Sequence, residues 1–130
     1  MVSSNAFNYI NVLNKAAGAS WIRNEVIANN IANVDTPNYK RSDVEFQGIL
    51  MEKLKGTSGS LNQKLASAKF NEVEPIIYKD YSSLSYRLDG NNVDIDTESA
   101  NLAKNQIRYN AIIDSMTQEF NRLNTVLKGL

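Results

Sequence analysis

The C-terminal end of the chain, residues 101–127, carries the pattern that most restricts the possible fold. Alternating steps of four and three from Leu102 reach apolar or aromatic residues at seven of eight positions. These positions are Leu102, Gln106, Tyr109, Ile113, Met116, Phe120, Leu123 and Leu127. The pattern is a heptad seam, which predicts a long helix that packs against another long helix.

The predicted helix is too long to be covered by an ordinary small globule. No Pro or Gly interrupts residues 91–128, and a helix of about 30 residues is roughly 45 Å long. We expect its partner over residues 6–31, where the apolar residues recur at helical spacing. That stripe contains Ile10, Leu13, Ala17, Ile27 and Ile31. The predicted fold is mainly α, with long helices in residues 1–33 and 96–130 paired as a coiled coil.

The composition argues against several classes of function. Lys plus Arg and Asp plus Glu are equal at 14 each, and no segment forms a basic patch. We therefore expect no binding to nucleic acid and no direct binding to lipid. The chain has no Cys and no His, which removes thiol chemistry, most metal sites and the usual general base. We expect no enzymatic activity, no metal and no cofactor.

No apolar run approaches the length that a bilayer-spanning helix needs. Residues 1–10 lack the basic and apolar regions of a secretory signal peptide. Taken alone, these features predict a cytoplasmic protein.

A tight turn is expected to follow the N-terminal helix. The helix should end near Asn33, because Pro37 moves Thr36 out of the α region. Asn38 then occupies the position of a type II turn that needs a positive φ, which Asn tolerates best after Gly.

The middle of the chain divides into two segments. Residues 34–55 contain the turn and then, over residues 43–55, apolar residues on one face of a short amphipathic helix, which we favour over a strand. Residues 56–95 begin with small polar residues typical of a flexible linker, over 56–67. They continue with two alternating stretches, 76–78 and 84–88, that indicate a small β-hairpin.

The densest acidic cluster precedes the long helix and comprises Asp89, Asp94, Asp96 and Glu98. A calcium loop fits poorly, because Val93 stands where an oxygen ligand is needed and Ala100 replaces the bidentate Glu. A structural role is favoured, in which Asp96 or Asp94 caps the helix and Glu98 adds negative charge to its first turn.

The sequence ANNIANVDTPNYK, residues 28–40, resembles the N-terminal signature of the flagellar basal-body rod, hook and hook-associated proteins. That signature commonly reads ANNIAN-x-x-TPGYK, with Gly where this chain has Asn38. The segments RSDVEFQGIL and DGNNVDIDTESANLAKNQIRYNAIIDSMTQEFNRL look like the proximal rod members in particular. The signature turn comprises Asn29, Asn30, Ile31, Ala32, Asn33, Thr36, Pro37, Asn38 and Tyr39. These residues either set the angle at which the chain leaves the helix and meets neighbouring subunits, or simply end and cap the helix.

The resemblance implies a structural subunit of the proximal rod, the shaft that links the membrane ring to the distal rod. It implies assembly through the terminal helices with copies of the chain, other rod proteins, a hub adaptor, the membrane ring and the export gate. It also implies export through the flagellar type III apparatus without a cleaved signal peptide, which revises the cytoplasmic expectation. The alternative is a cytoplasmic coiled-coil adaptor or export chaperone that binds one partner helix.

Assembly is expected through the N-terminal stripe and through the apolar residues of the C-terminal seam. An isolated chain would expose that seam, so we expect its termini to stay partly unfolded until assembly.

Overall fold

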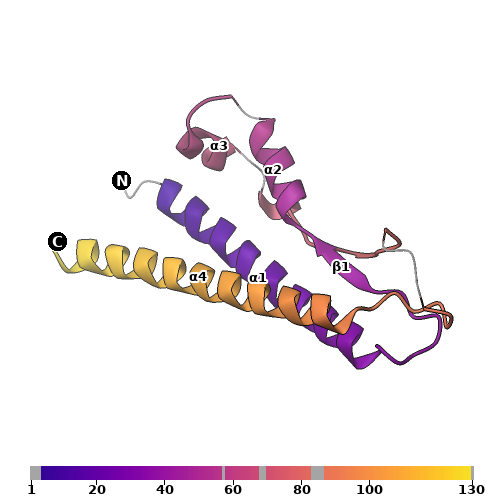
Figure 1. The fold of residues 1–130 in the computed structure, drawn as a ribbon. Helices are drawn as coiled ribbons and strands as arrows, with labels where there is room; N and C mark the ends of the chain where they lie inside the picture. The colour runs from indigo at the N-terminus through magenta and orange to yellow at the C-terminus, as the bar shows by residue number, and fades with distance from the viewer. Residues whose placement is uncertain (1–3, 57, 68–69, 83–86, 130) are drawn as a thin grey trace.

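The fold is built around two long helices that lie against each other. The computed structural model describes residues 4–56, 58–67, 70–82 and 87–129. Helices α1 (Ser4–Ala32) and α4 (Ile95–Lys128) run antiparallel, so that the start of α1 and the end of α4 share one end of the molecule (Figure 1). With 34 residues, α4 is about 51 Å long. The predicted mainly α fold with paired terminal helices is confirmed.

The middle segment forms a small layer on one side of α1 (Figure 1). Its elements are β1 (Ser42–Glu45), α2 (Gln47–Lys55), α3 (Leu61–Ser67), a 3-10 turn (Phe70–Glu72) and β2 (Ile76–Lys79). Strands β1 and β2 pair antiparallel, with Ser42 opposite Lys79 and Glu45 opposite Ile76.

The preference for a helix from residue 43 onward is wrong at its start. Residues 42–45 form β1, and the helix begins only at Gln47. Within β1 the side chain of Val44 is buried whereas that of Glu45 is exposed, which is the alternation of a strand. Pairing with β2, far away in the sequence, decides the conformation of these four residues.

The predicted linker over residues 56–67 is also partly wrong, because it contains α3. The Ser60 amide donates to Gln63 Oε1 (2.9 Å), and the Gln63 amide donates to Ser60 Oγ (3.4 Å). This reciprocal pair is a capping box that starts the helix. Leu65 then anchors α3 in an apolar cluster with Phe70 and Val73.

The predicted β-hairpin has the wrong partner strand. Its first strand is confirmed as β2, but β2 pairs with β1. Of the second predicted strand, residues 84–86 lie outside the described residues, and Arg87 begins a turn in which the Gly90 amide donates to the Arg87 carbonyl (3.1 Å).

Two local predictions at the helix ends are resolved. Asn38 has a φ of 60°, as the turn argument requires. Asp94 caps α4, because its Oδ1 accepts hydrogen bonds from the amides of Asp96 (3.0 Å) and Thr97 (3.5 Å). Asp96 therefore lies inside the first turn.

Candidate assembly interface and its polar clasp

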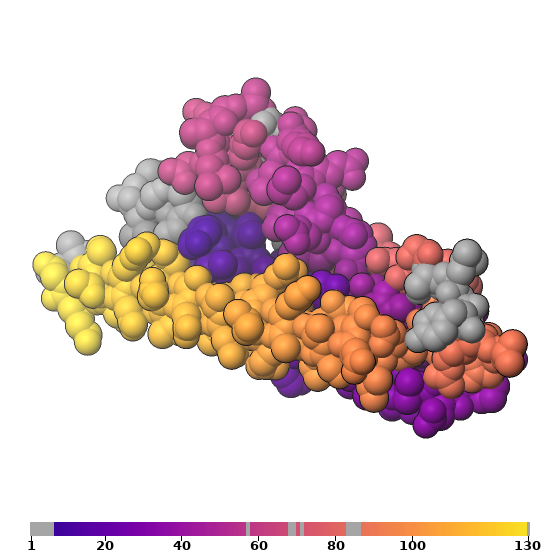
Figure 2. Space-filling model, in the orientation of Figure 1, coloured from indigo at the N-terminus to yellow at the C-terminus, as the bar shows by residue number. Residues whose placement is uncertain are grey.

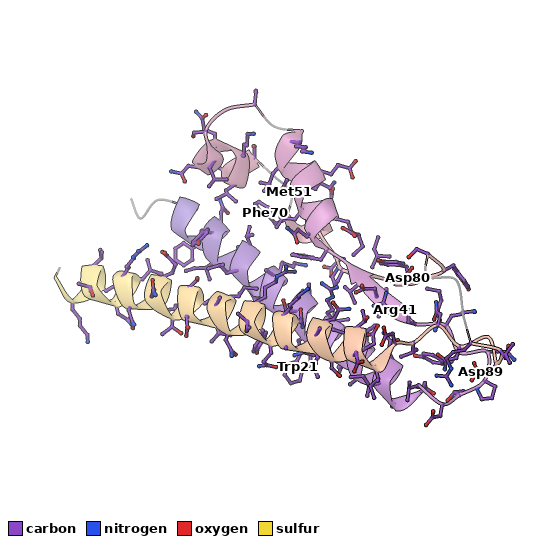
Figure 3. The ribbon with its side chains drawn as sticks, viewed as in Figure 1. Trp21, Arg41, Met51, Phe70, Asp80 and Asp89 are labelled. Atoms are coloured by element: carbon purple, nitrogen blue, oxygen red, sulfur yellow. The ribbon has the colours of Figure 1, made fainter. Side chains whose placement is uncertain are left out.

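A cluster of polar side chains, the polar clasp, joins the end of α1 to the start of α4. It comprises Asn30, Arg41, Asp43, Asp80, Asn91, Asn92 and Glu98. These residues come from both terminal helices and from the segments between them. Figure 3 shows Arg41 and Asp80 close together beside β1.

A buried ion pair lies at the centre of the polar clasp. The side chain of Glu98 is fully buried, and its Oε1 accepts a 2.6 Å hydrogen bond from Arg41 Nε. The other two nitrogens of the guanidinium group contact Asp80 and Asp43. Burial of the guanidinium group lowers the pKa of Arg41, but its hydrogen bonds and charges toward Glu98, Asp80 and Asp43 outweigh burial and raise that pKa. Arg41 is therefore a permanent cation that compensates the buried carboxylate.

Asn30, from the signature turn, ties α1 to β1 and α4. Its amide nitrogen donates to the Ser42 carbonyl (2.8 Å) and to Glu98 Oε2 (3.0 Å). Its amide oxygen accepts from the Ser42 amide (2.9 Å) and the Tyr39 hydroxyl (3.3 Å). The fully buried side chain thus pairs with the backbone of β1 in both directions and fixes the path of the chain after α1.

Asn91 and Asn92 hold the signature turn from the opposite side. The Asn91 amide nitrogen lies 2.8–3.0 Å from the carbonyls of Asn33, Val34 and Thr36, which belong to the turn after α1. The Asn92 amide oxygen accepts from the Arg41 backbone amide (2.7 Å). These side chains add to the backbone hydrogen bonds of the turn, in which the carbonyls of Asn33 and Thr36 also accept from the amides of Thr36 and Tyr39.

The other signature residues fall into two groups. Asn33 ends the helix, because its side chain donates to the Asn29 carbonyl (2.7 Å) and accepts from the Thr36 hydroxyl (3.1 Å). Ile31, Asn33 and Tyr39 are half-buried. The remaining five are exposed: Asn29, Ala32, Thr36, Pro37 and Asn38.

The N-terminal stripe faces the interior of the molecule. Ile10, Ala17 and Ile27 are buried, and Leu13 and Ile31 are half-buried. Trp21, also on α1, is exposed and lies against Tyr109 of α4 with ring centroids 6.2 Å apart.

The C-terminal seam is divided between two faces of α4. Leu102, Tyr109, Met116 and Leu123 are half-buried, in phase with the buried Glu98 and Asn105. The other seam positions, Gln106, Ile113, Phe120 and Leu127, are exposed. The structure therefore brings the two sets of seam residues onto neighbouring faces, and only the first is covered within the chain.

Sequence reasoning did not identify the polar clasp as a unit. One signal was available. Glu98 and Asn105 lie on the same helical stripe as Leu102 and Tyr109, because these four positions are separated by steps of four, three and four residues. A charged residue and an amide in phase with an apolar stripe indicate buried polar contacts. Arg41 carried no comparable signal.

Other kinds of site receive no support from the described part of the chain. Among residues 4–56, 58–67, 70–82 and 87–129, no group of three or more acidic side chains could hold a metal ion. In the same residues no helix has the length and apolar content required to cross a membrane.

Comparison with known proteins assigns the family. Residues 10–40 match the family described as Flagella basal body rod protein. The flagellar basal body rod protein FlgB of Bacillus subtilis (strain 168) is 38% identical over 122 residues, covering 90% of this chain and 91% of the relative. The FlgB protein of Borrelia hermsii is 38% identical over 134 residues (95% and 93%), and that of Aquifex aeolicus (strain VF5) is 30% identical over 123 residues (95% of each).

A mainly helical fold with this match defines a structural protein of the flagellar basal body rod. More narrowly, the chain belongs to the FlgB family of rod proteins. It is a structural subunit and not an enzyme, and the coiled-coil adaptor or chaperone alternative is not favoured.

Proposed function

We propose that this rod subunit occupies the proximal part of the rod and builds the shaft between the membrane ring and the distal rod through α1 and α4. The proposal depends on one observation. Ile113, Phe120 and Leu127 lie one heptad apart on an exposed face of α4. Large apolar side chains at this spacing are typical of a helix that packs against another helix. Since α1 contacts a different face of α4, the partner for this face comes from another subunit.

The open end of the helix pair supports the same proposal. Phe7 and Tyr9 near the start of α1 are exposed, as are Val126 and Leu127 near the end of α4. These residues lie at the end of the molecule away from the polar clasp (Figure 1). Burial of such side chains against neighbouring subunits would stabilise an assembly by about 1.5–3 kcal/mol each.

We assign roles in assembly to the segments predicted from the sequence. Residues 1–33 and 96–130 form the rod core. The exposed signature residues Asn29, Thr36 and Pro37 meet neighbouring subunits, while the buried Asn30 sets the exit angle of the chain.

The proposed partners are copies of the chain, other rod proteins, the hub adaptor, the membrane ring and the export gate. The proposed location is the periplasm-spanning rod, reached by flagellar type III export without a cleaved signal peptide. Support for both comes from the family match, since the relatives are named as basal body rod proteins.

Substitution of Phe120 separates assembly from folding. Its side chain is about half exposed, so Phe120→Ala should change the unfolding free energy of the isolated chain by less than about 1 kcal/mol. In the assembled rod the same truncation removes about 2–5 kcal/mol of packing. We expect loss of swimming and loss of the subunit from purified basal bodies.

The control is Gln118→Ala, an exposed position on another flank of α4, which should leave swimming intact. Leu123→Ala truncates a half-buried residue and should reduce both stability and swimming. Normal swimming of both the Phe120→Ala and the Leu123→Ala strains would contradict the proposed role of the seam.

A further inference from the structure

One exposed flank of α4 carries no charge along most of the helix. This uncharged strip comprises Gln106, Asn110, Ile113, Thr117, Phe120, Asn124 and Leu127, and all seven residues are exposed. They follow each other in steps of four and three, with amides or a hydroxyl between the apolar side chains.

A solvated flank of a helix normally carries charged residues. The flank of α4 opposite the strip does, with Lys104, Arg108 and Arg122. The uncharged strip therefore has the composition of an interface core, which is depleted in charge.

A groove lies between α4 and α1 on the side of their contact that faces away from the uncharged strip. It has a volume of about 390 Å³. The small residues Ala16 and Ala19 of α1 form one wall, Phe46 and Leu50 another, and Ile112 of α4 a third. Charged side chains also line the groove: Arg23, Asp43, Glu45 and Arg108. Figure 2 shows a hollow where α2, α1 and α4 meet. We name this hollow the lateral groove; its size suits several interdigitating side chains.

A buried acceptor without a donor lines the lateral groove. Asn105 is 3% exposed and lines the groove. Its amide nitrogen donates to the Ser20 carbonyl (2.7 Å) and to Asn24 Oδ1 (2.8 Å). A carbonyl only accepts, so this orientation of the amide is fixed. Asn105 Oδ1 has no donor among the described residues, and an unpaired buried acceptor costs about 1–3 kcal/mol.

We propose that the uncharged strip of one copy of this chain docks in the lateral groove of a neighbouring copy, and that an amide of the strip donates to Asn105 Oδ1. This proposal names the contact between copies in the rod and therefore rests on the proposed function. Asn110 and Asn124 supply N–H donors, and Ile113 and Phe120 supply apolar side chains for the groove walls. Of the charged residues that line the groove, Arg23 and Asp43 pair with each other (3.0 Å), and Glu45 and Arg108 are exposed.

The geometry also determines how the contact propagates. The strip and the groove lie on opposite flanks of α4, so the contact joins two different surfaces. Such a heterologous contact leaves a free strip and a free groove on every pair, and it repeats into a ring or an open helical array. A two-fold dimer through the strip alone would instead close.

Cysteine cross-linking tests this contact, because the chain contains no Cys of its own. Thr117→Cys lies in the uncharged strip, and Gln47→Cys lies in the lateral groove. Both positions are exposed, so the fold is retained, which circular dichroism verifies. The two variants are produced together in the flagellated cell, and purified basal bodies are treated with an oxidant. A disulfide requires Cα atoms within about 7 Å.

We expect a cross-linked chain dimer when the two variants are produced together and none from either variant alone. Gln118→Cys, which is adjacent to Thr117 but on a different flank, should give no dimer with Gln47→Cys. A dimer from Thr117→Cys alone would overturn the proposal in favour of a two-fold contact. An adduct between Thr117→Cys and a different protein, without any chain dimer, would also overturn it.

A charge in the strip provides a second measurement. Thr117→Glu should prevent incorporation of the chain into basal bodies, whereas Gln118→Glu should not. If the unsubstituted chain is found in basal bodies but the cross-link is absent, the proposed contact fails while the proposed function stands. Absence of the unsubstituted chain from basal bodies would refute the proposed function.

Discussion

Removal of the Arg41 side chain provides the sharpest test of the polar clasp. In an Arg41→Ala variant, Asp43 keeps its ion pair with Arg23 (3.0 Å), and Asp80 keeps its hydrogen bonds from Ser82. Glu98 and Asp80 both lose their cation, but the Glu98 side chain is only 1% exposed, whereas that of Asp80 is 18% exposed. Breaking a buried ion pair by removing one partner costs about 3–5 kcal/mol. At roughly 3–4 °C per kcal/mol for a chain of this size, the melting temperature should fall by about 10 °C or more.

The comparison uses a second arginine that pairs with a glutamate of α4. Arg122 contacts Glu119 at 2.6 Å, but its side chain is 70% exposed, so Arg122→Ala should cost less than about 1 kcal/mol. Both variants are unfolded in urea and followed by circular dichroism. The double variant Arg41→Ala, Glu98→Gln should recover more than half of the loss, because the neutral amide still accepts from Asn30. Equal stability of Arg41→Ala and Arg122→Ala would refute the assignment of a buried, compensated charge.

Three further predictions concern the turn and the helix start. Asn91→Leu removes a buried side chain that donates to the turn carbonyls and accepts from the Val93 amide (2.7 Å), and it should destabilise the chain by about 1–3 kcal/mol; urea unfolding within about 0.5 kcal/mol of the unsubstituted chain would contradict this. Asn38→Val forces a β-branched residue into a φ of 60° and should cost about 1–2 kcal/mol, whereas Asn38→Gly should cost less in the same assay. The hydroxyl of Ser82 lowers the pKa of Asp80, and the hydroxyl of Thr97 lowers that of Asp94. Because lowered folded-state values stabilise the chain above the unfolded pKa of about 3.9, stability should fall as the pH drops through the lower folded values, and Asp80→Asn should flatten that fall.

Local and periodic features of the fold could be predicted from the sequence. The heptad seam predicted α4 and its pairing with α1, and Pro37 predicted the end of α1 and the left-handed Asn38. Each of these depends on neighbouring residues or on a repeat along one helix. The capping box formed by Ser60 and Gln63 was an equally local signal for α3, and it was overlooked.

The remaining errors concern contacts between distant segments. Residues 42–45 have no strong intrinsic preference, and their conformation follows from pairing with Ile76–Lys79, more than thirty residues later. The two faces of the seam also could not be separated by spacing alone, because Ile113 and Met116 both satisfy the heptad pattern. The partner of Arg41 is likewise set by tertiary structure, since Glu98 follows it by 57 residues.

That separation has a consequence for the order in which the molecule can form. Asn30 and Arg41 contact Glu98, which lies 68 and 57 residues further along the chain, so these contacts form only when a long loop closes. A chain that emerges from its N-terminus through a narrow passage, such as a ribosome tunnel, cannot complete the polar clasp until Glu98 has emerged. By then about three quarters of the chain is free. Until then the end of α1 lacks its partner in α4, and the subunit can become rigid only after Glu98 has emerged.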